Sequence, residues 1–137
     1  MKIQFREFKS HLSKSLNSTS VILLYGSNQP EIKDLSNEVT EMLCGKSGIE
    51  EMRVNKMTEN ALLREPQNFY TAVKTLGFFP GRQILIIDGV TDRFTKILAS
   101  HLKNLTQDDA TLILLANKLK VTSTVRKMLE KDNRSIC

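Results

Sequence analysis

The residues that follow the apolar segment 21–25 are the first place where this sequence could bind a phosphate. A phosphate-binding P-loop has the pattern G-x-x-x-x-G-K-[ST], in which glycines free backbone N–H groups and a lysine neutralises charge. Gly26 fits the first position, but Glu31 and Ile32 stand where the second glycine and the lysine are required. Because a carboxylate repels phosphate, this degenerate loop predicts that the chain does not bind ATP in the usual way.

The triplet Gly45-Lys46-Ser47 matches the last three letters of the same pattern. The earlier glycine position is Thr40, however, which lies inside a predicted helix rather than after a strand. We interpret the triplet as a loop that ends this helix.

Polar residues also follow the apolar segments 84–87 and 111–116. Asp88 resembles the strand-terminal acid that holds magnesium in P-loop enzymes, but Gly89 replaces the second acid needed to activate water. A single aspartate there fits a turn or a helix cap better than a metal site. Asn117 occupies the place of a polar sensor residue in AAA+ proteins, and it fits a turn before Lys118 better.

No grouping of serine, cysteine or histidine suggests a nucleophile with its base, and no spaced pair of strand-end carboxylates suggests acid–base catalysis. Cys44 and Cys137 are far apart, with only His11 and His101 as possible co-ligands. The sequence therefore predicts no metal site and no cofactor. We expect His101 to be a partly buried or surface histidine. These patterns point away from an enzyme.

The segment 76–83, LGFFPGRQ, carries the strongest indication of partner binding. Phe78 and Phe79 are adjacent in a glycine–proline loop and cannot easily both face inward, and exposed aromatic pairs commonly anchor partner proteins. Phe78 can equally pack back on the preceding helix, as the hydrophobic contact that accompanies a glycine cap at Gly77. The residues alone support binding and packing equally.

Four apolar segments predict the strands that would position these residues, at 21–25, 52–57, 84–87 and 111–116. The second alternates only weakly, which is typical of a strand near the edge of a sheet. Apolar stripes predict a helix after each strand, within 32–43, 69–76, 94–105 and 125–129, and one before the first strand that ends near residue 16.

Capping and breaking residues predict where these helices begin and end. We expect Gly45 and Gly48 to end the helix over 32–43, and a polar loop that contains Pro66 to follow the second strand. Thr91 and Ser123 are expected to cap the last two helices.

The alternation of strands and helices predicts the fold class. Parallel strands require crossover connections, so we expect an α/β domain of three layers, with a mostly parallel sheet flanked by helices. A length of 137 residues suits one domain. The chain stops within residues 133–137, where such a fold would begin another strand, so we expect a truncated larger protein.

The formal charge of +5 favours contact with an acidic partner. Basic residues are denser between Lys118 and Arg134, where Glu130 and Asp132 offset part of their charge. We interpret this basic stretch as a solvated helix face rather than a functional patch. No apolar run is long enough to span a membrane, and the amino terminus has no signal-peptide core, so we expect a cytoplasmic protein with reduced thiols. The basic residues of the stretch are Lys118, Lys120, Arg126, Lys127, Lys131 and Arg134.

Three segments together resemble the delta-subunit family of bacterial DNA polymerase III clamp loaders. They are VILLYGSNQPEIKD at 21–34, LGFFPGRQILIIDG at 76–89 and TLILLANKL at 111–119. The resemblance covers nearly the whole chain and implies an AAA+-like domain, of the RecA type derived from P-loop proteins, over residues 1–137. In the family a small lid domain and a collar domain follow, and both would be absent here.

The resemblance implies a subunit that binds the sliding clamp (the beta subunit) and helps to open it for loading onto primed DNA during replication. Phe78 and Phe79 align with the hydrophobic pair that enters a pocket on the clamp, with Leu76 beside them. The family often has Leu-Phe there, so Phe78 departs from the family pattern in shape.

The same resemblance implies no reaction of the domain's own. Partner subunits would hydrolyse ATP, and polymerase (nucleotidyltransferase) activity would come only by association with the holoenzyme. Other loader subunits would bind through the absent domains, contact with DNA would be indirect or weak, and no membrane is implied as a partner.

Two other functions stay open from the sequence. One is a P-loop-derived nucleotide-binding enzyme with divergent motifs. The other is a receiver-like signalling domain phosphorylated on Asp88, although receivers need an acidic cluster beside that aspartate, which this chain lacks.

Overall fold

The structure, a computed structural model, describes residues 21–26, 29–50, 54–74, 83–103, 111–117, 122–131 and 135–136. Side chains are described for these ranges except 44–50, 73–74, 130–131 and 135–136. The predicted helix that ends near residue 16 lies outside this part of the chain. In chain order the described elements are β1 (Val21–Tyr25), α2 (Gln29–Glu50), β2 (Val54–Thr58), α3 (Glu59–Arg64), α4 (Pro66–Lys74), β3 (Ile84–Asp88), the 3-10 helix η1 (Asp92–Phe94), α5 (Thr95–Lys103), β4 (Thr111–Ala116), α6 (Thr124–Lys131) and β5 (Ser135–Ile136).

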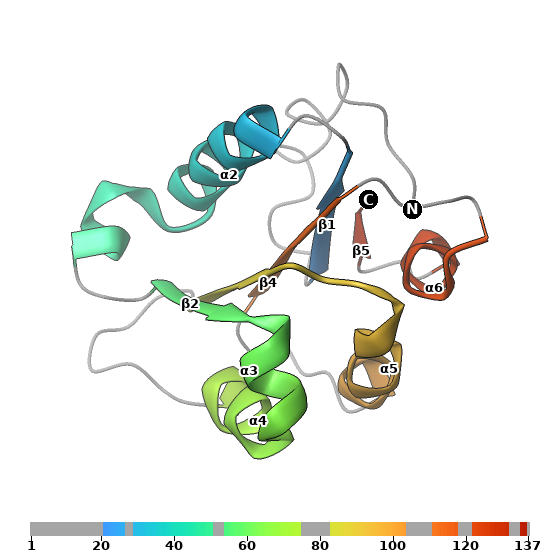
Figure 1. Cartoon of the computed structure of the whole chain (residues 1–137). Helices are drawn as coiled ribbons and strands as arrows, with labels where there is room; N and C mark the ends of the chain where they lie inside the picture. Colours follow the sequence, from blue (N-terminus) through green and yellow to red (C-terminus); the bar gives the residue numbers. More distant parts are fainter. Residues whose placement is uncertain are drawn as a thin grey trace.

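The strands form one sheet in the order β2-β3-β4-β1-β5, and every described pairing is parallel (Figure 1). In the central pair, Leu23 of β1 lies opposite Leu114 of β4. The predicted α/β class is therefore confirmed. β2 lies at an edge, as its weak alternation predicts, and β5 is the strand expected after the last helix.

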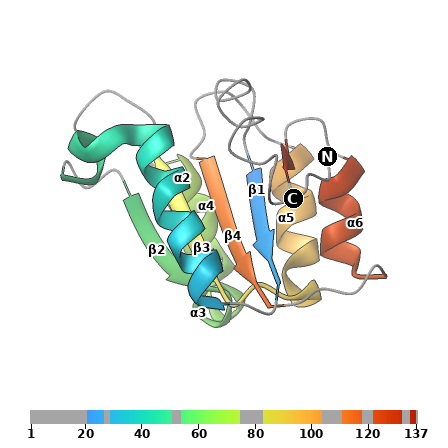
Figure 2. The same ribbon diagram turned by 90° about the horizontal axis from the view of Figure 1, so that it is seen from above.

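The helices divide between the two faces of the sheet according to the direction in which the chain moves. From β1 to β2 the chain crosses the sheet one way, and from β2 onward it returns through β3 and β4 to β5. Right-handed crossovers then place α2 on one face and α3 to α6 on the other. Figures 1 and 2 show this three-layer arrangement.

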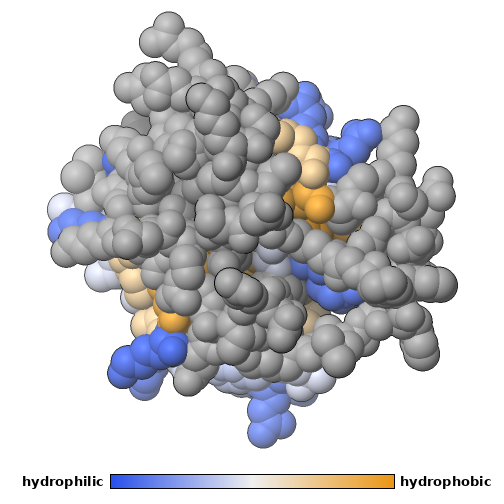
Figure 3. Space-filling model, turned by 180° about the vertical axis from the view of Figure 1, so that it is seen from behind, coloured by the Kyte–Doolittle hydropathy of each residue, from blue (hydrophilic) through white to orange (hydrophobic). Residues whose placement is uncertain are grey.

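The core has two parts because the strands bury both of their faces. All six residues of β4 are buried. Ile113 and Leu115 belong to the same part of the core as Ile32 of α2. Leu112 and Leu114 face the helices on the other side. In Figure 3, strongly hydrophilic residues project at the outline of the molecule, and only small hydrophobic areas are visible inward of them.

His101 of α5 lies inside the larger part of the core, which corrects the prediction of a partly buried or surface histidine. It is only 4% exposed. Its ring packs edge-on against Phe69 of α4, with 5.5 Å between the ring centres, and Phe94 meets Phe69 at the same distance. The packing of α5 against α4 therefore buries a residue that the helical pattern alone places beside the buried stripe.

Two predicted segment boundaries are wrong. α2 continues through Gly45 and Gly48 to Glu50, so the triplet at 45–47 is helical rather than a loop. A glycine costs a helix only about 1 kcal/mol relative to alanine, which does not by itself end a helix held by packing.

The prediction of a polar loop after the second strand is also wrong. The segment that follows β2 forms α3 and the start of α4. Thr58 caps α3, since its hydroxyl accepts from the N–H of Ala61 at 3.3 Å. Pro66 opens α4, where a missing N–H is tolerated.

The predicted caps at Thr91 and Ser123 are confirmed. Thr91 accepts from the N–H of Arg93 at 3.2 Å, at the start of η1, which leads into α5. Ser123 accepts from the N–H of Arg126 at 3.4 Å, at the start of α6. None of the described helices is both long and apolar enough to cross a membrane.

Candidate functional site

The crevice between the carboxyl ends of β1 and β4 is where an open α/β sheet usually binds its ligand, because α2 and α6, the helices that follow these two strands, lie on opposite faces of the sheet. The side-chain amide of Gln29 bridges this crevice. Its Nε2 donates to the carbonyl of Gly26 at 3.0 Å and to the carbonyl of Ala116 at 3.2 Å. Gln29 thus ties the start of α2 to the ends of both strands.

The residues of the predicted degenerate phosphate loop lie around the same junction. Gly26 has a φ of 154°, a conformation that favours glycine. Ile32 is 8% exposed and packs in the α2 half of the core with Leu35 and Val39. Glu31 is exposed. The position that would hold a phosphate-binding lysine therefore contributes apolar packing instead.

The ends of β3 and β4 carry the other two predicted positions. Asp88 is exposed, and its Oδ1 accepts from the N–H of Gly89 at 2.9 Å, in a turn where Gly89 has a φ of 73°. Asn117 is exposed at the bend after β4. Within the described ranges, no group of three or more His, Cys, Asp and Glu residues could hold a metal ion.

Glu59 is a buried carboxylate at this edge that the sequence analysis did not identify. It is 2% exposed, and it accepts from the N–H of Thr91 at 2.9 Å and from the hydroxyl of Thr91 at 2.9 and 3.1 Å. Arg93 Nη2 lies 3.8 Å from the carboxylate. Glu59 therefore joins the start of α3 to the loop after β3. Its partners lie 32 or more residues away, so no local pattern indicates this role.

Asp92 makes a second connection, between η1 and α6. Its Oδ1 accepts from the hydroxyl of Ser123 at 2.6 Å and from the N–H of Val125 at 3.2 Å. The hydrogen bond from Ser123 is the largest cause of a lowered pKa for Asp92, and the hydrogen bonds at the start of α6 act in the same direction. The sequence indicated the cap at Ser123 but not its partner.

The basic stretch near the carboxyl terminus is not uniformly solvated. Arg126 is 8% exposed and lies over the ring of Tyr25, 5.0 Å from its centre. Lys127 is exposed, as a solvated helix face predicts. For Arg126 the prediction is wrong, because α6 packs this side chain against the end of β1.

The predicted hydrophobic anchor, Leu76 with Phe78 and Phe79, lies outside the described residues. In the chain it falls between the end of α4 and the start of β3. Its role stays a prediction. Lys118, Lys120 and Arg134 of the basic stretch also lie outside the described residues.

Comparison with known proteins shows what this fold resembles. No protein-family model matches the chain, and no curated protein matches its sequence. A solved structure, the Bacillus subtilis DNA clamp loader delta protein (YqeN), is similar over 93% of this chain, with a TM-score of 0.65 and 17% sequence identity. The chain spans 41% of the length of that protein. The likeness shows a clamp-loader-like α/β fold.

Proposed function

We propose that this protein is a clamp-loader subunit of the delta type, which binds a sliding clamp and helps to open it for loading onto primed DNA. The observation that carries the proposal is the likeness of its fold, over 93% of the chain, to a Bacillus subtilis clamp loader delta protein. The chain spans 41% of that protein's length, so the likeness covers only part of the neighbour. Assembly with other loader subunits is therefore a proposal as well.

The junction at β1 favours a binding module over an ATPase. Gln29 bridges the crevice between β1 and β4, and Ile32 is part of the core at the position of the P-loop lysine. In the proposed role the domain has no reaction of its own, and partner subunits hydrolyse ATP. The protein would act in the cytoplasm within the DNA polymerase III holoenzyme, whose polymerase activity it joins by association, and its contact with DNA would be indirect or weak.

The proposed contact with the clamp is the hydrophobic group formed by Leu76, Phe78 and Phe79. The elements on either side of these residues in the chain are firmly packed. Phe69 of α4 is fully buried, and the first four residues of β3 are buried as well. Rigid elements that flank a binding segment reduce the entropy lost when the segment engages a partner.

The test replaces both rings, as Phe78→Ala with Phe79→Ala, and measures binding to an immobilised bacterial sliding clamp by surface plasmon resonance. We expect affinity to fall at least about tenfold, because truncated aromatic anchors typically cost 2 kcal/mol or more. The melting temperature should fall by only about 2–6 °C. Tyr70→Ala is the matched control, since this exposed aromatic of α4 lies outside the proposed group and should leave affinity unchanged.

Two outcomes would contradict this assignment. A folded double variant with the affinity of the unsubstituted protein removes the anchor role. If both rings belong to the core, the double variant should instead lose about 3–5 kcal/mol per ring and unfold. An unsubstituted chain that shows no binding to the clamp removes the proposed function itself.

A further inference from the structure

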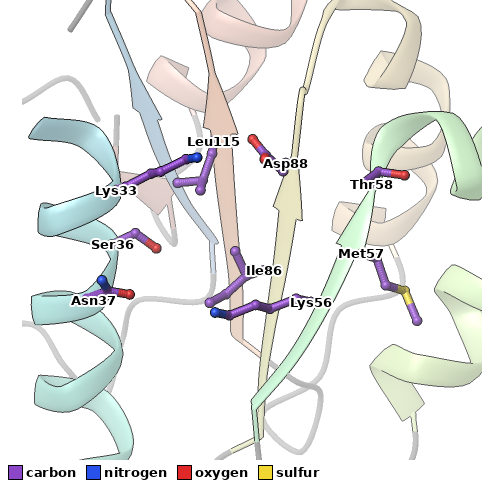
Figure 4. A pocket seen from close by; sticks show the side chains of 9 residues that line it. All are labelled: Lys33, Ser36, Asn37, Lys56, Met57, Thr58, Ile86, Asp88 and Leu115. Carbon is purple, nitrogen blue, oxygen red and sulfur yellow. The ribbon is translucent and has the colours of Figure 1, made fainter. Parts of the chain in front are cut away.

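A pocket of about 400 Å³ lies on the α2 face of the sheet, between α2 and the carboxyl halves of β2 and β3 (Figure 4). Its size is in the range of small-molecule sites, which begins near 300 Å³. Its polar lining comes from α2 (Lys33, Ser36, Asn37), from β2 (Lys56, Thr58) and from Asp88 of β3. Gly26 and Gln29 do not line it, so the pocket is separate from the bridged crevice beside β1.

Ser36 places a hydroxyl in this pocket. The residue is 3% exposed, and Figure 4 shows its oxygen pointing from α2 into the pocket. Its carbonyl accepts from the hydroxyl of Thr40 at 2.8 Å, and its own hydroxyl faces the pocket. A ligand in the pocket would therefore meet this hydroxyl, which can donate a hydrogen bond to it.

Two lysines from different elements border the same space. The side chain of Lys56 extends from β2 toward α2, and that of Lys33 extends from α2 toward β3 and β4 (Figure 4). In the described part of the chain, neither ammonium forms an ion pair. Among the described residues of the lining, Asp88 is the single carboxylate, and it accepts from the N–H of Gly89. These described residues together carry one more positive charge than negative.

We propose that this pocket binds a small organic anion through a phosphate group. Lys33 and Lys56 supply the opposite charge, and the Ser36 hydroxyl donates a hydrogen bond to a phosphate oxygen. A small molecule fits better than a nucleic-acid backbone, because Ser36 is buried and the exposed carboxylate of Asp88 would repel a continuous line of phosphates. This proposal is independent of binding to the clamp.

The test is calorimetric titration of the full chain with glycerol 3-phosphate, and with glycerol as the matched probe that lacks the charge. We expect heat of binding with the phosphate ester alone. Lys33→Gln and Lys56→Gln should each weaken binding about tenfold, as the loss of a charge-assisted contact predicts, and Ser36→Ala about fivefold. Lys96→Gln, an exposed lysine of α5 on the other side of the sheet, should leave affinity unchanged.

Three results would overturn the proposal. One is an absence of binding heat with glycerol 3-phosphate up to millimolar concentrations. Another is an equal loss of affinity in Lys96→Gln, which would indicate general attraction to a basic protein. The third is tighter binding of a short DNA duplex that Lys33→Gln and Lys56→Gln also abolish, which would make the surface a nucleic-acid contact. Both lysines are exposed, so these variants should remain folded.

Discussion

Glu59 and Asp92 show how single carboxylates hold the carboxyl edge of the sheet in place. Each accepts hydrogen bonds from residues more than 30 positions away, Glu59 from Thr91 and Asp92 from Ser123 and Val125. Hydrogen bonds to an ionised acceptor are stronger than those between neutral groups. The loop after β3 is therefore fastened on one side to α3 and on the other side to α6.

The lowered pKa of Asp92 predicts a dependence of stability on pH. Because the folded value lies below the ordinary value of 3.8, the ionised carboxylate stabilises the folded state above that pH, and this contribution is lost as the pH falls through the folded value. Asp92 is exposed, so we expect at most about 1 kcal/mol.

The measurement is urea unfolding of Asp92→Asn and of the unsubstituted protein at about pH 7 and about pH 3. The variant should be less stable at the higher pH, and the difference should be smaller at the lower one. Asp34→Asn, at an exposed position of α2, is the control. A difference that stays constant between the two pH values would show that the charge of Asp92 has no role.

The junction of β1 and α2 lies where a phosphate-binding loop would join a strand to a helix, but its described side chains differ in chemistry from those of such a loop. α2 begins directly after the loop, as the corresponding helix does in P-loop proteins. Its first turns pack on the sheet through Ile32 and Leu35. A lysine at Ile32 would have to bury its charge in this packing or pull the first turn of α2 away from the sheet.

From this packing we predict that Ile32→Lys destabilises the fold without creating an ATP site. The free energy of unfolding should fall by about 2–5 kcal/mol, because the variant removes a buried apolar side chain and introduces a charge. Titration calorimetry with Mg-ATP should show no binding for the variant or for the unsubstituted chain.

Asp34→Lys introduces the same side chain at an exposed position of the same helix. It should change stability by no more than about 0.5 kcal/mol. Micromolar binding of Mg-ATP to the unsubstituted chain would reverse this interpretation of the loop and would favour a nucleotide-binding enzyme.

Over the whole molecule, the sheet is covered unevenly. β4 has strand partners on both edges and buries all six residues, whereas β2 lies at an edge and exposes Asn55, Lys56 and Thr58. Amide groups in fully buried central strands open only with global unfolding, whereas edge strands also open locally.

Hydrogen exchange should therefore be slowest in β4 and β1 and clearly faster in β2. The measurement is native-state exchange followed by mass spectrometry or NMR, at increasing urea concentrations below the unfolding transition. We expect the amides of β4 to report the global free energy of unfolding and those of β2 to exchange with a lower free energy. Equal protection of both strands would show that the domain opens as a single unit.

The sequence alone determined the strands and the class of the fold, because those depend on local patterns. The apolar runs of β1 and β4 are only 5 and 6 residues long, which favours strands buried on both faces over helices, and the weak alternation in β2 indicates an edge. The caps at Thr91 and Ser123 were also visible, since a hydroxyl just before a helix acts within three residues.

Only the tertiary structure decided which polar side chains meet. Gln29 reaches Ala116, Glu59 reaches Thr91, and Ser36 lines a pocket with residues of three strands. Each of these depends on elements far apart in the sequence that the right-handed crossovers of a parallel sheet bring together. Periodicity predicts which face of an element is apolar, but the partner of a buried polar group depends on the packing of the whole chain.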